Sequence, residues 1–253
     1  MWSHTRSLEL LVLVATVAPA ELIRVATAFG PAARAGASTG AGVGPGAGAG
    51  ADRGRAARWG TLGAPAAYLA VTALAVAVAA DGGFVPDTLT GWRAGAPWLA
   101  AAVVVGVALV GAEFAVGAVP RLLDGTGLPR LAVHRGAGPA GGGYAAAVLV
   151  TAAVEEVLYR GLWIGVLHER LRLPVAVAVG AAAVAYAVGH LFFGGLAVVQ
   201  KAVSGTVFGL LAVVSGSLAV PLAAHLAQNG AVVALALRQE RGGRATGRRA
   251  AAG

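Results

Sequence analysis

Two adjacent glutamates and an arginine interrupt an otherwise apolar stretch of the sequence, Thr151 to Leu167. Ionised side chains at bilayer depth cost roughly 3 kcal/mol each, so Glu155, Glu156 and Arg160 need a physical reason to be there. Residues four apart share one face of a helix, which predicts an ion pair between Glu156 and Arg160. Glu155 points about 100° away from Glu156, and Tyr159, one turn on, is placed to donate a hydrogen bond to it. Glu156 is therefore held in an ion pair, whereas Glu155 stays available for a reaction. The alternative is that Glu156 and Arg160 form a structural salt bridge and Glu155 has no function.

Two further polar pairs occur in apolar stretches nearer the C-terminus, each at one-turn spacing. "AYAVGH" contains Tyr186 and His190, and "AHLAQN" contains His225 and Asn229. Taken singly, such a histidine is more often a packed polar residue or an anchor at the membrane interface. Together with Glu155 they should converge on the interior of a helix bundle, because none of them is stable facing lipid. A glutamate and two histidines can activate water for hydrolysis, either through a metal ion or directly.

The composition predicts the elements that must position these groups. Of the 253 residues, 58% are hydrophobic and only 12% are charged, with a mean hydropathy of +0.77. Soluble domains carry about 25% charged residues. The apolar residues form long blocks and do not alternate as in a barrel strand, which predicts an all-α, polytopic transmembrane helix bundle. Cysteine is absent, which excludes a disulfide framework and a thiolate metal site.

The apolar blocks predict six to seven spans. Residues 1–30 form an apolar segment that either spans the membrane or lies in its interface, and a flexible Gly/Ala-rich linker is expected over residues 31–60. Residues 61–143 should hold two accessory transmembrane helices and a basic loop, and residues 238–253 a basic, disordered tail. The six expected spans after the linker are Leu62–Ala80, Pro97–Val119, Tyr144–Leu167, Pro174–His190, Leu196–Val214 and Leu218–Leu237.

The formal net charge of +8 does not indicate nucleic-acid binding, because the arginines gather at the flanks of apolar blocks. Positive charge in such flanks marks the cytoplasmic side of a membrane. The loop after the first span is net acidic, whereas the loop after the second span and the C-terminal tail are basic. We therefore expect an integral protein of a bacterial plasma membrane, with the linker and the C-terminus in the cytoplasm.

The three motifs resemble those of one protein family. "EEVLYR" fits EExxxR, "YAVGH" fits an aromatic-xxx-His motif and "HLAQN" fits HxxxN, in that order and in successive expected spans. The sequence thus resembles the CPBP family of CAAX prenyl endopeptidases, bacteriocin-processing and immunity proteins, and Abi membrane proteins. The resemblance covers roughly residues 144–237, which become the expected catalytic core. Tyr186 stands where the family usually has phenylalanine, which keeps an aromatic ring.

The resemblance implies an intramembrane peptidase of the glutamic type. Glu155 would be the general base that deprotonates water, and His190 would hold that water. His225 and Asn229 would donate hydrogen bonds to the tetrahedral oxyanion. In the remaining motif positions, Glu156 and Arg160 would fix the helix and set the local field.

The number of free carboxylates indicates whether water would be activated by a metal ion or by the Glu155 side chain itself. Glu155, His190 and His225 match the ligand types of a catalytic zinc site. Zinc hydrolases usually add a separate carboxylate base, and here the remaining acid, Glu156, is expected to be tied to Arg160. We therefore expect no cofactor, with zinc bound by Glu155, His190 and His225 as the alternative.

The expected function is an endopeptidase that acts on membrane-associated peptides, including lipidated or precursor peptides, with the lipid bilayer and no nucleic acid as its other partner. The first alternative is a non-catalytic immunity or scaffold protein of the same family. The second is a proton-coupled transporter, for which Glu113 would offer a further acid; a helix-end carboxylate near Arg121 explains Glu113 more simply. Transporters commonly contain inverted repeats, and this sequence shows no internal repeat.

Ideal straight helices do not bring the predicted site together. At about 1.5 Å per residue, Glu155 lies near the middle of the bilayer, His190 near the cytoplasmic end of its span and His225 in the outer half. The spans should therefore be tilted or broken, for which "GHLFFGG" and Pro221 are the candidate positions. "GTVFG", Gly205 to Gly209, has a spacing that permits close helix contact, although glycine is abundant throughout the chain.

Overall fold

The computed structural model describes residues 13, 14, 16, 17, 48–128 and 142–251, and within this part of the chain all regular elements are helical. The expected all-α fold is confirmed. The helices are α4 (Gly48–Asp81), α5 (Asp87–Thr90), α6 (Ala96–Leu123), α7 (Gly142–Glu155), η1 (Glu156–Trp163), η2 (Val166–Arg170), α8 (Val175–Val188), η3 (Leu191–Phe193), α9 (Gly195–Ser215) and α10 (Ala219–Ala251).

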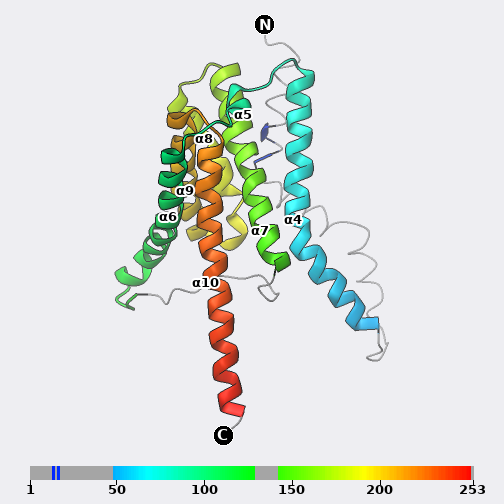
Figure 1. Ribbon diagram of the computed structural model, residues 1–253, viewed down its shortest axis with the longest axis vertical. Helices are drawn as coiled ribbons and strands as arrows, with labels where there is room; N and C mark the ends of the chain where they lie inside the picture. The colour runs from blue at the N-terminus through cyan, green and yellow to red at the C-terminus, as the bar shows by residue number, and fades with distance from the viewer. Residues whose placement is uncertain (1–12, 15, 18–47, 129–141, 252–253) are drawn as a thin grey trace.

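The long helices form one elongated bundle (Figure 1). α6 packs against α10, α8 packs against α9, and α7 lies between α4 and α10. The π-helix η1 continues α7 and contacts α4, α5, α8, α9 and α10. The segment made of α7 and η1 is therefore the centre of the bundle, and it carries the two glutamates and the arginine.

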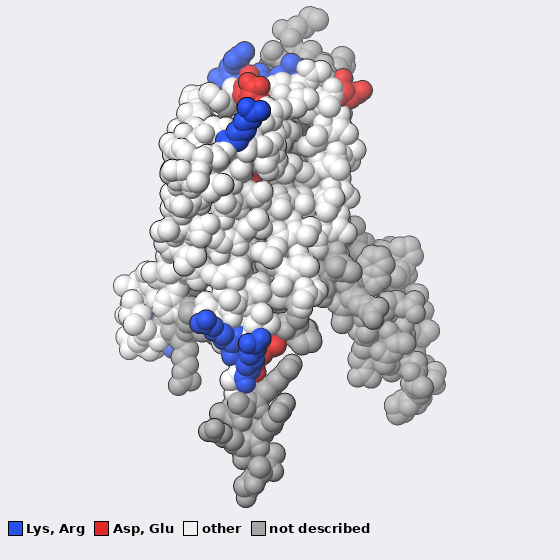
Figure 2. Space-filling model, in the orientation of Figure 1, with Lys and Arg blue, Asp and Glu red and all other residues white. Residues whose placement is uncertain are grey.

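Charged side chains gather at the two ends of the bundle, and the surface between them is almost free of charge on the face that Figure 2 shows. By length and composition, three helices can each cross a membrane: Ala96–Leu123, Gly195–Ser215 and Ala219–Gly242. Pro65–Asp81 and Val175–Val188 are shorter apolar helices. A large apolar surface on several parallel helices identifies a helical membrane protein.

Two segments are helical where the sequence predicted irregular chain. Residues 48–60 of the expected linker belong to α4, and residues 238–251 of the expected tail belong to α10. Both stretches are rich in alanine and arginine, which have high helix propensity, so a neighbouring helix can continue through them. Most of the apolar segment 1–30, residues 31–47 of the linker and the loop over 129–141 lie outside the described residues, so whether segment 1–30 spans the membrane stays open.

The predicted break at "GHLFFGG" is the connection between α8 and α9. α8 has only 14 residues, or about 21 Å, against a hydrocarbon core of about 30 Å. The chain then turns through His190 and the 3₁₀ helix η3, and Gly194 adopts a φ of +98° before α9 begins. His190 lies in this turn, two residues after the end of α8, and is partly buried. Pro221 does not break a helix, because it falls in the first turn of α10, where proline is tolerated.

Candidate functional site

The predicted ion pair between Glu156 and Arg160 is present and fully buried. Arg160 Nη1 lies 3.1 Å from Glu156 Oε1, and both side chains are 1% exposed. The second guanidinium nitrogen, Nη2, donates to the carbonyl oxygen of Gly205 on α9 at 3.1 Å. Arg160 thus joins the central helix to α9 as well as neutralising Glu156, which lowers the cost of burying both charges.

His225 lies between the two glutamates. Its Nδ1 donates a hydrogen bond to Glu156 Oε1 at 2.6 Å, and its Nε2 lies 3.8 Å from Glu155 Oε2. A carboxylate can only accept, so this contact places the ring proton on Nδ1 and leaves Nε2 of the neutral ring as an acceptor. α10 therefore brings one imidazole against both carboxylates, Glu155 at the end of α7 and Glu156 at the start of η1.

Tyr186 of α8 and His190, in the turn that follows α8, join the same cluster. The Tyr186 hydroxyl lies 3.4 Å from His225 Nε2, and the rings of Tyr186 and His190 meet edge to face at a centroid distance of 4.9 Å. His190 Nδ1 donates to the carbonyl oxygen of Tyr186 at 3.0 Å. This bond also leaves Nε2 of a neutral His190 as an acceptor, so both predicted histidines present the same type of nitrogen.

Asn229 is half-buried one turn further along α10. Among the described residues, the contacts that join the cluster do not include its side chain. The preceding residue, Gln228, is fully buried, and neither end of its amide has a hydrogen-bond partner within the described chain. Buried amides are usually satisfied by a partner or by internal water, so Gln228 is a polar group that the sequence motifs did not single out.

Tyr68 of α4 is a second residue that the motifs missed. Its side chain is 3% exposed and belongs to the buried cluster that also contains Tyr159 and Tyr186. Tyr159, which was expected to donate to Glu155, instead donates to the carbonyl oxygen of Val17 at 3.3 Å. The available signal was the position of Tyr68 in a helical stripe with Thr72, a pair of hydroxyl side chains one turn apart in an apolar segment.

Aromatic rings fix the buried cation and the imidazole. Phe208 of α9 stacks on His225 with a centroid distance of 4.7 Å, and the Arg160 guanidinium lies 4.6 Å from the Tyr186 ring centre. Close packing of α9 makes this possible: a methyl group added at Gly205 would come within 2.9 Å of the Tyr186 ring, and one at Gly209 within 2.8 Å of Val179. The small-residue spacing of "GTVFG" is thus used for contact between α8 and α9.

Glu113 lies outside this cluster. Its carboxylate pairs with Lys201 of α9 at 2.8 Å, and Gln200 Nε2 donates to its main-chain oxygen at 2.6 Å. The expected proximity to Arg121 is therefore replaced by a pair that joins α6 to α9. A carboxylate held by a cation in this way is a structural link, which gives no support to a proton relay through Glu113.

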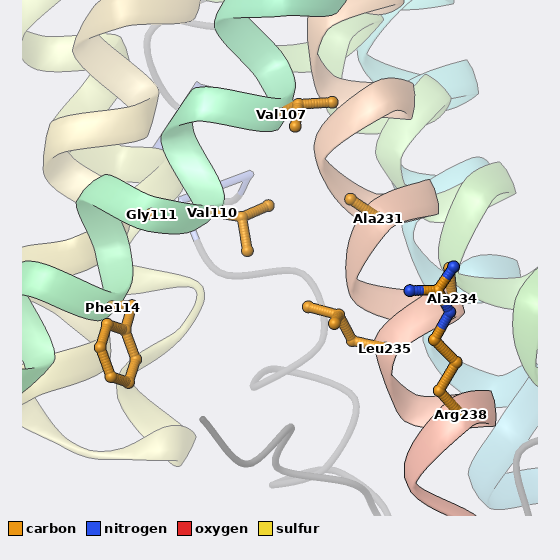
Figure 3. A pocket seen from close by; sticks show the side chains of 8 residues that line it. All are labelled: Val107, Val110, Gly111, Phe114, Ala231, Ala234, Leu235 and Arg238. Carbon is orange, nitrogen blue, oxygen red and sulfur yellow. The ribbon is translucent and has the colours of Figure 1, made fainter. Parts of the chain in front are cut away.

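A hollow of about 430 Å³ lies between the middle parts of α6 and α10 (Figure 3). Its walls are apolar apart from Arg238, and they include Val107, Phe114 and Leu235. At about 100° per residue, the α10 residues that line it lie about 180–280° around the helix from His225. The hollow therefore faces away from the glutamates and histidines and belongs to a different surface.

Residues that could hold a metal ion were predicted as Glu155, His190 and His225. Among the described residues, no group of three or more His, Cys, Asp or Glu side chains is arranged to hold one. The Glu155 carboxylate faces His225, and His190 reaches the cluster through Tyr186. The arrangement can orient a carboxylate and two imidazole acceptors around solvent.

The part of the chain that contains this cluster matches a known protein family. Residues 141–231 match the Rce1-like family, described as type II CAAX prenyl endopeptidase Rce1-like. No curated protein and no solved structure matches the chain. The matched segment contains all three motifs, whereas α4, α5 and α6 lie outside it. The match confirms the resemblance to the CPBP family, and residues 141–231 are accordingly an Rce1-like segment.

Proposed function

We propose that this protein is an intramembrane endopeptidase that hydrolyses peptide bonds of membrane-associated peptides. The observation that carries the proposal is the buried contact of the Glu155 carboxylate with His225, inside a segment that matches a family of CAAX endopeptidases. An acid that is 4% exposed among apolar helices is costly to keep, and such acids mark functional sites.

Glu155 would act as the general base. It would take a proton from water, and the resulting hydroxide would form a bond to the carbonyl carbon of the scissile amide. The electron pair of that carbonyl would move to its oxygen. When the carbon–nitrogen bond breaks, Glu155 would return the proton to the departing amine, so the side chain ends the cycle as it began.

The histidines would hold the reacting atoms. Nε2 of His190 is available to accept a hydrogen bond from the attacking water. His225 would enter the cycle with a proton taken on Nε2 from solvent, would donate it in a hydrogen bond to the oxyanion, and would release it to solvent after the products leave. The Glu156 carboxylate at 2.6 Å from Nδ1 would stabilise that charged ring. Asn229 would contribute the second donor from the next turn of α10.

The substrate would be a peptide that reaches the site from the membrane, including a lipidated or precursor peptide, with the bilayer as the other partner. The site is built from helices whose outer surfaces are apolar, so a substrate anchored in lipid meets it without leaving the membrane. The reaction would need no cofactor, because Glu155 supplies the base directly.

The test uses purified full-length protein in detergent and fluorogenic membrane-anchored peptides. Glu155→Gln and His190→Ala should each lower turnover by about 10²–10⁴-fold, the range expected for loss of general acid–base catalysis. Glu113→Gln is the matched control, since it makes the same change at a carboxylate paired with Lys201, and it should retain turnover. Equal turnover by the wild type and Glu155→Gln would contradict the catalytic proposal and favour a binding or scaffold role.

A chelator arm distinguishes the two ways of activating water. Direct carboxylate chemistry predicts that turnover survives prolonged chelation. Loss of turnover that zinc restores, in proportion to the metal bound by the pure protein, would instead assign Glu155, His190 and His225 to a metal site.

A further inference from the structure

The hollow between α6 and α10 lies beyond the closest contact of these two helices. They run in the same direction, since a backbone hydrogen bond of 2.6 Å joins Leu218, just before α10, to Gly91 in the loop before α6. Gly106 then packs against the main chain of Ala224, and the helices separate toward their C-terminal ends (Figure 1). Gly111 adds to the space, because a methyl group there would meet nothing within 4 Å.

The walls of the hollow match a lipid chain in chemistry and in length. Both helices are long and apolar enough to cross a membrane, and Val107 in the wall is 50% exposed. Leu235 points from α10 toward Val110 of α6 across the hollow (Figure 3). The lining residues cover about 10 Å along each helix, and the hydrocarbon layer of one leaflet is about 15 Å thick. The hollow can therefore take part of an acyl chain of one leaflet.

Arg238 provides a cation at the depth of a lipid headgroup. It is the charged residue of the wall, its side chain is exposed, and no hydrogen bond or ion pair joins it to another described residue. At about 1.5 Å per residue it lies about 28 Å from Ala219, the first residue of α10, close to the far edge of a hydrocarbon core of about 30 Å. A guanidinium at this level is placed to donate two hydrogen bonds to a phosphate.

Other charges at this level are mainly positive. Arg241 follows one turn after Arg238, and both are exposed. Arg121 of α6 lies about 22 Å along its helix from the close contact of α6 and α10, and Arg238 about 21 Å along α10 from the same contact. Glu240 lies about 200° around α10 from Arg238, on the other side of the helix. Basic pockets between spanning helices bind anionic lipid headgroups.

We propose that this hollow binds one anionic phospholipid from the leaflet at the C-terminal end of α10. One acyl chain would lie between α6 and α10, and the phosphate would accept hydrogen bonds from Arg238. The hollow lies on a different side of α10 from His225, whereas a lipid group carried by a peptide substrate would have to lie beside the glutamates. The site is therefore separate from the proposed peptidase site and does not depend on that function.

The test measures which lipid the protein binds. Purified full-length protein, stripped of lipid in detergent, is incubated with phosphatidylglycerol or phosphatidylcholine of identical acyl chains, and bound lipid is counted by native mass spectrometry. The wild type should bind one phosphatidylglycerol about 10-fold more tightly than phosphatidylcholine, because only the former carries net negative charge. Millimolar inorganic phosphate should not displace it, since free phosphate has no acyl chain; displacement would assign a simple anion site and overturn the proposal.

Two variants remove the two halves of the site. Arg238→Gln removes the cation and should weaken binding of phosphatidylglycerol by about 10-fold. Ala234→Leu puts a larger side chain into the hollow and should weaken it at least as much. The matched controls are Arg93→Gln, an exposed arginine in the loop before α6, and Ala108→Leu, an exposed alanine of α6 outside the wall. Both controls should bind like the wild type.

Thermal melting gives a second readout, because a ligand that binds the folded state raises its melting temperature. Phosphatidylglycerol should raise that of the wild type and of both controls, and neither lining variant should respond. Equal binding of the two phospholipids by the wild type, or wild-type binding by either lining variant, would overturn the proposal. A dimer that forms when lipid is stripped and that Ala234→Leu disrupts would assign the hollow to a second copy of the chain instead. If Ala234→Leu does not fold, Arg238→Gln decides, because it changes an exposed side chain.

Discussion

The chemistry of this protein depends on a balance of charges around one imidazole. Glu155 and Glu156 approach opposite nitrogens of His225, and Arg160 neutralises only Glu156. With both carboxylates ionised and His225 neutral, the buried group therefore carries one net negative charge, and a proton on His225 brings it to zero. A neutral total is the more stable one in low dielectric, so in the proposed mechanism the cluster as a whole favours binding one proton.

The ion pair within this group should be essential for folding. Arg160→Met would leave the buried Glu156 without its cation, and removing one partner of a buried pair typically costs about 3–5 kcal/mol of unfolding free energy. The measurement is a thermal or denaturant melt in detergent. Glu156→Gln combined with Arg160→Met removes both charges and should recover part of the loss. If Arg160→Met alone were as stable as the double variant, the buried ion pair would not explain the loss of stability.

Among the helices, the position of His225 depends on how closely α6 approaches α10. Gly106 of α6 packs against the main chain of Ala224, the residue before His225, and a methyl group at Gly106 would collide with the Ala224 carbonyl oxygen. The main chain cannot rotate away as a flexible side chain can. Close contact between these two helices therefore fixes the depth and direction of the imidazole.

Gly106→Ala should push α10 away from α6. We expect a loss of stability of about 1–3 kcal/mol, as for other overpacked contacts, together with a fall in turnover because His225 moves. Gly111→Ala is the control on the same helix, since an added methyl there meets nothing within 4 Å. It should be neutral or stabilising, because alanine is the better helix former. Similar melting temperatures and turnover for both variants would argue against the close contact.

Across the molecule as a unit, the distribution of charge sets the orientation in the membrane. One end of the bundle carries the loop between α4 and α6, and the other carries the C-terminal part of α10 (Figures 1 and 2). The latter contains Arg238 and Arg241, and basic residues next to apolar spans are retained in the cytoplasm. We propose that the C-terminus is cytoplasmic.

Reporter fusions test this orientation. A fluorescent protein fused after residue 253 should be fluorescent, and alkaline phosphatase at the same place should be inactive. Alkaline phosphatase inserted into the loop region from Gly82 to Gly95 should be active, because this region lies on the side of the membrane opposite to the C-terminus. The reverse pattern at both positions would place the C-terminus outside and invert the proposed topology.

The fold class and the motif residues could be predicted from the order of amino acids alone. A composition with long apolar blocks permits only helices in lipid, because every backbone polar group must be paired within its own segment. The ion pair between Glu156 and Arg160 was predictable as well, since both partners lie on one helix at a spacing of four residues. These are local properties, and local spacing is what a sequence displays directly.

Which separate helices meet could be learned only from the folded chain. Glu113 of α6 and Lys201 of α9 pair across 88 positions of the sequence, and no motif connects them. His190 likewise meets the cluster through its contacts with Tyr186 at the turn after α8. Contacts of this kind depend on where helices stop, bend and pack, which is set by the summed packing of the whole bundle and not by any one segment.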